Sequence, residues 1–220
     1  MKMNILIIDD HPAQVDAYAS IFELANDAVE FTFYKYSSLK DAYEFAMEDE
    51  EAQNVNLAVL DLNMPACKEL DLYSGADLAR VIQKQIPHTE LCFITSHYEA
   101  LILYDLYQEF HPAGILVKTD FNGDQLESHF QDILSGQPTY SPTFLNAQKK
   151  VAASAILLDY HNREIIKKLA EGYPSKDLPE MIDLSMSAID KRKSRLKTFF
   201  HTENKPDNYL VLEARDQRLI

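Results

Sequence analysis

Four short apolar runs in this chain each end in polar residues that can bind a cation or a phosphate. In chain order, these polar residues are Asp9 and Asp10, then Asp61, then Thr95, and finally Lys118. Three carboxylates that lie close together repel one another and are costly unless a cation neutralises them. Oxygen ligands of this kind suit Mg²⁺, which binds through one or two carboxylates, keeps several waters and often meets a phosphate. The set therefore predicts metal-assisted phosphate chemistry.

Each of these polar residues suits a distinct role. Asp61 would be the nucleophile that attacks an activated phosphate in line and forms an acyl phosphate. Lys118 offers a mobile positive charge to one phosphoryl oxygen, and the Thr95 hydroxyl can donate to another. The plainer interpretation is that these groups only cap strands, and for a lone aspartate it would be the better one. Five polar positions in order favour the chemical interpretation.

The elements that would position these residues are strands of a parallel sheet. An apolar run closed by a turn signal, such as residues 58–60 before Asp61 and Pro65, is typical of a buried strand with both faces covered. The expected strands cover residues 4–8, 30–36, 58–60, 91–96 and 114–118, and the expected helices lie around residues 15–22, 38–48, 75–86, 98–110 and 123–135. Five strands alternating with five helices predict a doubly wound α/β fold whose strands end at one edge.

Charge is unevenly distributed along the chain. The formal net charge is −14, yet residues 1–150 carry 24 acidic and 9 basic residues, so the remainder is close to neutral. Such asymmetry indicates two units with different partners.

Cysteine usage and hydropathy favour a cytoplasmic protein that contacts no membrane. Cys67 and Cys92 form neither a CxxC motif nor a disulfide framework, as expected in a reducing compartment. No apolar run approaches the roughly 18 residues of a membrane span. The first residues also lack the charged-then-apolar layout of a signal peptide.

Residues 3–136 resemble the receiver domain of two-component response regulators. The resemblance rests on five residues in order, namely Asp9, Asp10, Asp61, Thr95 and Lys118. It implies a flavodoxin-like five-stranded sheet, phosphorylation of Asp61 by a sensor histidine kinase, and Mg²⁺ held by Asp9, Asp10, Asp61 and the Asn63 carbonyl. It also implies no enzyme activity beyond this self-modification. A haloacid-dehalogenase-like phosphatase would require a second acid where Asn63 stands.

Three features depart from, or add to, the receiver pattern. The segment 66–74 is longer than the family usually has, and it would contact a kinase, shield the acyl phosphate or be a tolerated surface insertion. Ile115 stands where receivers carry an aromatic ring that turns inward on phosphorylation, which leaves Tyr98 or Tyr104 as substitutes. His97 occupies a position that affects phosphate lifetime in this family, although such a histidine is more often simply exposed.

Beyond a linker at 137–155, residues 156–220 read as a helical domain. Asp159 can cap a first helix, which ends at Gly172. Ser175 can cap a second helix, and Ser185 or Ser187 can cap a third. The third helix carries five basic residues, which are Lys191, Arg192, Lys193, Arg195 and Lys197. Short helices followed by a basic one fit a helix-turn-helix, whose last helix enters the major groove of DNA. A basic helix taken alone is more often a solvated face.

After a receiver, this tail resembles the LuxR-type helix-turn-helix, which makes the chain similar to a NarL/FixJ-type response regulator. The resemblance rests on residues 169–172, 184–185 and 194–196. Pro179 and Asp190 depart from the pattern, because proline removes a backbone donor and an acid opposes phosphate binding. A final helix over 207–219 would pair protomers.

Two hypotheses of different classes follow. The leading one is a transcription regulator that is phosphorylated on Asp61 and binds double-stranded DNA as a homodimer, with Lys191, Arg192 and Arg195 as the main DNA contacts and Lys193 and Lys197 as further ones. The alternative is a signalling adaptor whose degenerate C-terminal domain binds protein. DNA binding that weakens steeply with salt would favour the first.

Overall fold

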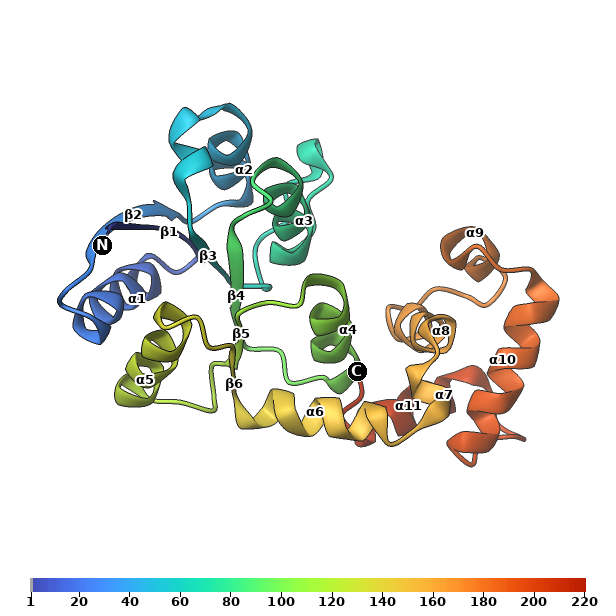
Figure 1. The fold of residues 1–220 in the computed structure, drawn as a ribbon. Coiled ribbons are helices and arrows are strands. Elements are labelled where there is room, and N and C mark those ends of the chain that lie inside the picture. Colours follow the sequence, from blue (N-terminus) through green and yellow to red (C-terminus); the bar gives the residue numbers. More distant parts are fainter. Residues whose placement is uncertain (1) are drawn as a thin grey trace. The chain divides into compact units, whose positions relative to one another are not determined.

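Six parallel strands form a single sheet in the computed structural model, which describes residues 2–220, in the order β2-β1-β3-β4-β5-β6 (Figure 1). The strands are β1 (Lys2–Ile8), β2 (Glu30–Tyr36), β3 (Leu57–Leu60), β4 (Glu90–Thr95), β5 (Gly114–Val117) and β6 (Thr139–Tyr140). The central strands β3 and β5 are buried along their whole length, as continuous apolar runs predict. The doubly wound parallel α/β fold is thereby confirmed.

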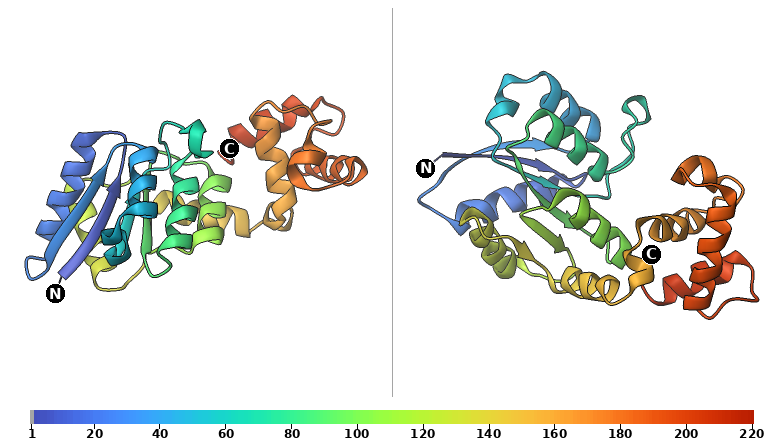
Figure 2. Two further views of the ribbon diagram at one scale, coloured as in Figure 1. Left: turned by 90° about the horizontal axis from the view of Figure 1, so that it is seen from above. Right: turned by 45° about the vertical axis from the view of Figure 1, so that its right-hand side comes forward.

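Helices cover both faces of the sheet (Figures 1 and 2). Their bounds in this part of the chain are α1 (Pro12–Ala25), α2 (Leu39–Glu48), η1 (Glu50–Asn54), η2 (Lys68–Leu70), α3 (Gly75–Gln85), α4 (Ala100–Phe110) and α5 (Gly123–Leu134). On one face, Phe22 of α1 stacks on Phe130 of α5 with ring centroids 3.7 Å apart. Both rings belong to a core that includes Ile5, Val59 and Ile94 of the sheet. This core holds the strand ends in place.

The sixth strand is a difference from the expected five. Thr139–Tyr140 pairs with β5, and the Ser141 hydroxyl accepts a hydrogen bond from the buried Val117 N–H at 3.0 Å. Two residues are too few to show strand periodicity, so pattern alone does not reveal this strand. The region expected to be a linker, 137–155, thus contains β6 and all of α6 (Pro142–Ala152).

The chain divides into two units, of which the first consists of residues up to His97 together with Leu106–Phe144. The second comprises Tyr98–Asp105 and Leu145–Ile220, so the start of α4 belongs to it. Its remaining helices are α6 (Pro142–Ala152, from Leu145 onward), α7 (Ala155–Leu158), α8 (Tyr160–Ala170), α9 (Leu178–Ile182), α10 (Met186–Phe199) and α11 (Asp207–Asp216). No helix within residues 2–220 combines the length and apolarity that crossing a bilayer requires.

In the second unit, the predicted cap residues are confirmed at two helices and wrong at a third. The Asp159 carboxylate accepts from the Asn162 N–H at the start of α8, and Ser185 accepts from the Ala188 N–H at the start of α10. The prediction that Ser175 caps the second helix is wrong, because α9 begins at Leu178. Ser175 instead donates a hydrogen bond to Asp207 at 2.8 Å.

Candidate functional site

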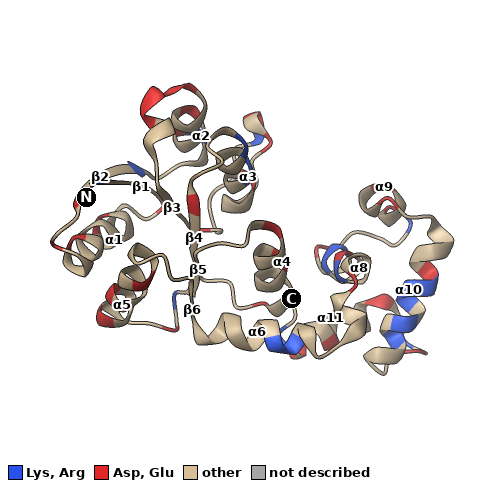
Figure 3. Cartoon of the chain, in the orientation of Figure 1, with Lys and Arg blue, Asp and Glu red and all other residues tan. Residues whose placement is uncertain are grey.

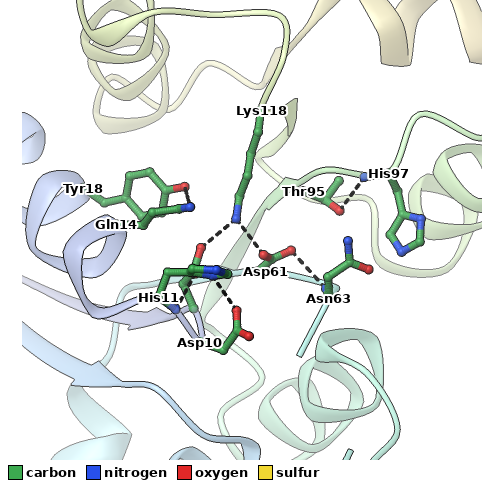
Figure 4. Close-up of polar contacts among 10 residues, drawn as sticks. Asp10, His11, Gln14, Tyr18, Asp61, Asn63, Thr95, His97 and Lys118 are labelled. Carbon is green, nitrogen blue, oxygen red and sulfur yellow. Dashed lines mark hydrogen bonds and ion pairs between the residues drawn. The ribbon is translucent and has the colours of Figure 1, made fainter. Parts of the chain in front are cut away.

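The structure brings the five polar residues of the strand ends to one edge of the sheet (Figure 4). Asp9 and Asp10 follow β1, Asp61 follows β3, Thr95 ends β4 and Lys118 follows β5. These four strands are neighbours, and parallel strands end at the same edge. The backbone reinforces the arrangement, since the Asp61 N–H donates to Ile8 O at 2.9 Å and the Lys118 N–H donates to Thr95 O at 2.8 Å.

Lys118 connects two buried carboxylates at the centre of this edge. Its Nζ atom lies 2.8 Å from Asp9 Oδ2 and 2.6 Å from Asp61 Oδ2. The side chains of these aspartates are only 1% and 3% exposed. Burial works to lower the pKa of Lys118, but the hydrogen bonds and charges of Asp61 and Asp9 outweigh it and raise that pKa. The lysine is therefore held in its charged form between two anions.

Asp10 and His11 extend the carboxylate group on the side away from Lys118. Ligand atoms of Asp9, Asp10 and His11 all lie within 4.8 Å of one another. His11 Nδ1 is 2.8 Å from Asp10 Oδ1, but this oxygen, shielded from solvent, makes no hydrogen bond among the residues that the structure describes. Carboxylate oxygens in this arrangement fit a divalent cation. The sequence pattern did not identify His11 as a residue of this site. Its position directly after the acidic pair is the feature that could have indicated it.

The loop after β3 approaches Asp61 closely. The Asp61 Oδ1 atom accepts a hydrogen bond from the Asn63 N–H at 3.0 Å. Gly75, at the start of α3, donates its N–H to Leu62 O, and a Cβ atom at this glycine would lie 1.9 Å from the Asp61 carbonyl oxygen. Real Cβ atoms do not approach backbone so closely, so only glycine fits here.

The segment 66–74 folds on itself between these two contacts. Cys67 and Leu72 form an antiparallel bridge, and Asp71 adopts a left-handed conformation with a φ of 53°. The Tyr73 side chain is exposed, while its N–H donates to Asp77 of α3 at 2.8 Å. The insertion is therefore an ordered surface turn, and its contact with a kinase stays a prediction.

Thr95 and the residues around it define the other side of the site. The Thr95 side chain is fully buried, and its hydroxyl accepts from the His97 N–H at 3.1 Å. Ile115 is fully buried in β5, whereas Tyr98 is exposed. Tyr18 of α1 is buried close to the same carboxylates. Burial, followed by the charges of Asp9 and Asp61, raises the pKa of its hydroxyl, which keeps a neutral phenol beside the carboxylates.

The five basic residues of α10 fall into two groups, and the first group is engaged within the second unit. Arg192 pairs with Asp159 at 2.7 Å and donates to the side-chain Oδ1 atom of Asn162 at 3.0 Å. Lys193 and Lys197 both pair with Asp207 at the start of α11, at 2.5 and 2.9 Å. These three side chains therefore help to join α10 to α8 and α11.

The second group consists of Lys191 and Arg195. Both residues are exposed, and among the residues that the structure describes neither forms an ion pair or a side-chain hydrogen bond. DNA contact by any of the five basic residues stays a prediction. Figure 3 shows the basic residues of α10 along the helix. Of the five, Lys191 and Arg195 are the two without a competing partner within residues 2–220.

Residues 5–130 match the response regulator receiver domain family. The oxygen regulatory protein NreC of Staphylococcus epidermidis is 23% identical over 232 residues, and NreC of Staphylococcus carnosus is 22% identical over 230 residues. Each alignment covers 99% of both chains.

Solved structures of RcsB show the same fold. A structure of two RcsB dimers bound to two parallel DNAs superposes with a TM-score of 0.64 at 17% identity, covering 98% of each chain. RcsB of Salmonella enterica serovar Typhimurium, bound to a promoter in the presence of the phosphomimetic BeF3⁻, gives a TM-score of 0.64 at 18% identity and covers 96% of this chain and 97% of that one. The family match and the strand-end site agree, and the chain belongs to the response regulator receiver domain family.

Proposed function

We propose that this protein is a transcription regulator controlled by phosphorylation of Asp61. The observation that carries the proposal is the double contact of Lys118, which places a cation against the carboxylate of Asp61 at the end of β3. A sensor histidine kinase or a small phosphodonor would supply the phosphoryl group. An Asp61 carboxylate oxygen forms the new bond to phosphorus as the bond to the donor breaks, and the donor leaves with that electron pair.

Asp9, Asp10, Asp61 and the Asn63 carbonyl would hold Mg²⁺. When bound, this ion neutralises charge on the phosphoryl oxygens. The solvent-shielded Asp10 Oδ1 atom and the adjacent Asp9 support this assignment, because carboxylate oxygens are the ligands that a hard cation prefers and the ligand atoms of these two residues lie within 4.8 Å of each other. We expect the protein to catalyse no turnover other than its own phosphorylation.

Phosphorylation changes the partners of Lys118 and Thr95. The lysine exchanges its bond to the Asp61 carboxylate for a phosphoryl oxygen, and the Thr95 hydroxyl donates to another oxygen instead of only accepting from His97. These new contacts exist only in the phosphorylated state, so they shift a pre-existing conformational equilibrium.

The output of the proposed switch is binding to double-stranded DNA by α10, with two protomers on successive half-sites. The exposed Lys191 and Arg195 support this output, as do the RcsB structures, in which RcsB dimers are bound to DNA. Neutralising phosphates releases counterions, so binding by these cations should weaken steeply with salt.

Intact mass spectrometry tests the receiver chemistry. The full chain is incubated with acetyl phosphate and Mg²⁺ beside an Asp61→Asn variant. We expect one phosphoryl group on the wild type and none on the variant. No gain of mass, under conditions that modify a control receiver, would overturn phosphorylation of Asp61.

A protein-binding adaptor is the second candidate function. It is favoured by the engagement of Arg192, Lys193 and Lys197 within the protein, which leaves α10 with few free cations. Fluorescence anisotropy with labelled duplexes across 50–200 mM salt, an interval in which multi-phosphate contacts lose about 10³- to 10⁵-fold in affinity, separates the two. Steep salt dependence contradicts the adaptor, whereas absence of duplex binding by the phosphorylated protein contradicts the transcription regulator.

A further inference from the structure

The exposed side of α10 is mainly polar. Ile189 and Leu196 are buried seven residues apart and mark the inward side of the helix. Its exposed polar residues are Ser187, Asp190, Lys191, Ser194, Arg195 and Thr198, at spacings of three and four residues, and the exposed Met186 and Phe199 flank them at the two ends of the helix. We call this set the α10 outer face. It contains one acid, Asp190.

Asp190 is the unusual member of the α10 outer face. It forms no ion pair or side-chain hydrogen bond among the residues of the chain that the structure describes, although Lys193 lies one turn further along the same helix. Lys193 is held by Asp207 at 2.5 Å, which leaves the Asp190 carboxylate without an internal cation. The protein therefore presents a free anion at the surface proposed to meet a polyanion.

The position of Asp190 along α10 limits what it can contact. The helix begins at Met186 after the Ser185 cap, so Asp190 lies in its N-terminal half. In a helix-turn-helix, the N-terminal residues of the last helix contact base edges. A phosphate offers only acceptors and a negative charge, so a carboxylate at this position has no favourable partner on the DNA backbone.

The base edges of the major groove offer donors that a carboxylate can use. Cytosine presents its N4 amino group there, and aspartate and glutamate accept hydrogen bonds from it. We infer that Asp190 is a specificity-determining residue that accepts from the N4 amino group of a cytosine in each half-site. The inference rests on the proposed function, since it requires α10 to enter the major groove.

Lys191 and Arg195 complete the recognition chemistry. Both are cations on the same face, and each can donate to a phosphate or to the O6 and N7 atoms of guanine. Their positive charges offset the repulsion between Asp190 and the DNA backbone. The α10 outer face therefore suits a half-site that combines cytosine and guanine and rejects sequences that lack the cytosine amino donor.

Selection from a random duplex library tests this inference. Phosphorylated full-length wild type and an Asp190→Asn variant are each used to enrich bound duplexes. We expect the wild type to select cytosine at one position of each half-site. Asparagine pairs with adenine N6 and N7, so the variant should prefer adenine at that position and bind the wild-type site about 5- to 150-fold more weakly.

An Asp216→Asn variant is the matched control. Asp216 is exposed on α11, outside the α10 outer face, and its substitution removes the same charge. This variant should keep the cytosine preference. An unchanged preference in Asp190→Asn, including one with uniformly raised affinity, would show that Asp190 only repels phosphates and would overturn the inference. Failure of the wild type to enrich any duplex would instead overturn the proposed DNA binding, and the inference with it.

Discussion

Lysines are held by aspartates both at the strand-end site and on α10, but in different surroundings. Lys118 lies between two carboxylates that are almost fully buried. Lys193 and Lys197 share Asp207, whose side chain is 28% exposed. Solvent and salt screen an exposed pair strongly and a buried one weakly. Loss of one partner should therefore be severe at the strand ends and mild on α10.

The same comparison separates two uses of charge. At the strand ends, the charges satisfy one another. In the proposed function, a phosphoryl group would replace one of these contacts, so the site would change partners. On α10, the paired lysines fix the helix against α11, while Lys191 and Arg195 remain available to an external partner. A basic residue on this helix therefore cannot be assigned to DNA contact from its charge alone.

The largest expected effect is that of Lys118→Met. This substitution leaves Asp9 and Asp61 as buried, uncompensated charges, and we expect it to lower the free energy of unfolding by about 3–5 kcal/mol. Urea unfolding measures the loss. Lys35→Met is the control, because Lys35 pairs with Asp16 at 2.8 Å where both side chains are exposed. This substitution should lower the free energy of unfolding by less than about 1 kcal/mol. Equal losses would contradict the comparison.

Gly75→Ala should have the next largest effect. The added Cβ would meet the Asp61 carbonyl oxygen at 1.9 Å, and backbone cannot yield as a flexible side chain does. We expect a loss of about 3 kcal/mol in unfolding free energy, together with slower phosphorylation by acetyl phosphate.

Gly123→Ala provides the contrast for this substitution. A Cβ at Gly123, also at the start of a helix, meets nothing within 4 Å, and it should stabilise the protein by about 0.5–1 kcal/mol. A Gly75→Ala protein of wild-type stability would show that the loop after β3 can move away from the site.

Asp207→Asn should have a smaller effect that depends on pH. Burial works to raise the pKa of Asp207, but hydrogen bonds from Lys193, Lys197 and Ser175 outweigh it and lower the pKa from 3.8 to about 2. Because the folded-state pKa is depressed, the stabilisation is fully present above about pH 4 and is lost as pH falls toward 2. Near neutral pH, Asp207→Asn should lower the free energy of unfolding by about 1 kcal/mol.

Urea unfolding at pH 6 and pH 3 measures this dependence. The difference in free energy of unfolding between wild type and Asp207→Asn should be smaller at pH 3 than at pH 6. Asp216→Asn should have the wild-type free energy of unfolding at both pH values. A difference that widens on acidification would show that Asp207 does not hold the two lysines in solution.

The smallest expected effect distinguishes Lys191 from Lys193 in DNA binding. If Lys191 contacts a phosphate, Lys191→Ala should reduce the slope of log affinity against log salt by about 0.9. Lys193→Ala should change that slope little, because Lys193 is engaged by Asp207. Anisotropy titrations at several salt concentrations measure both slopes. A larger change for Lys193 would mean that its pairing with Asp207 is broken on DNA.

The sequence by itself determined the fold class and which polar residues end the strands. Apolar runs ending in Asp9, Asp61, Thr95 and Lys118 indicate parallel strands, and the carboxyl ends of such strands meet at one edge. This inference works because the strand pattern and the position of each polar residue within it are local properties of the chain. The same holds for the caps at Asp159 and Ser185, which act on residues three positions away.

Only the tertiary structure decided which groups contact one another across long stretches of chain. Lys118 bonds to Asp9, 109 residues away, and the close approach of Gly75 to Asp61 depends on how a loop folds back. The division of the α10 cations depends on where α8 and α11 place Asp159 and Asp207. Periodicity shows which face of a helix is polar, but the partner of a charge is fixed by the packing of elements distant in sequence.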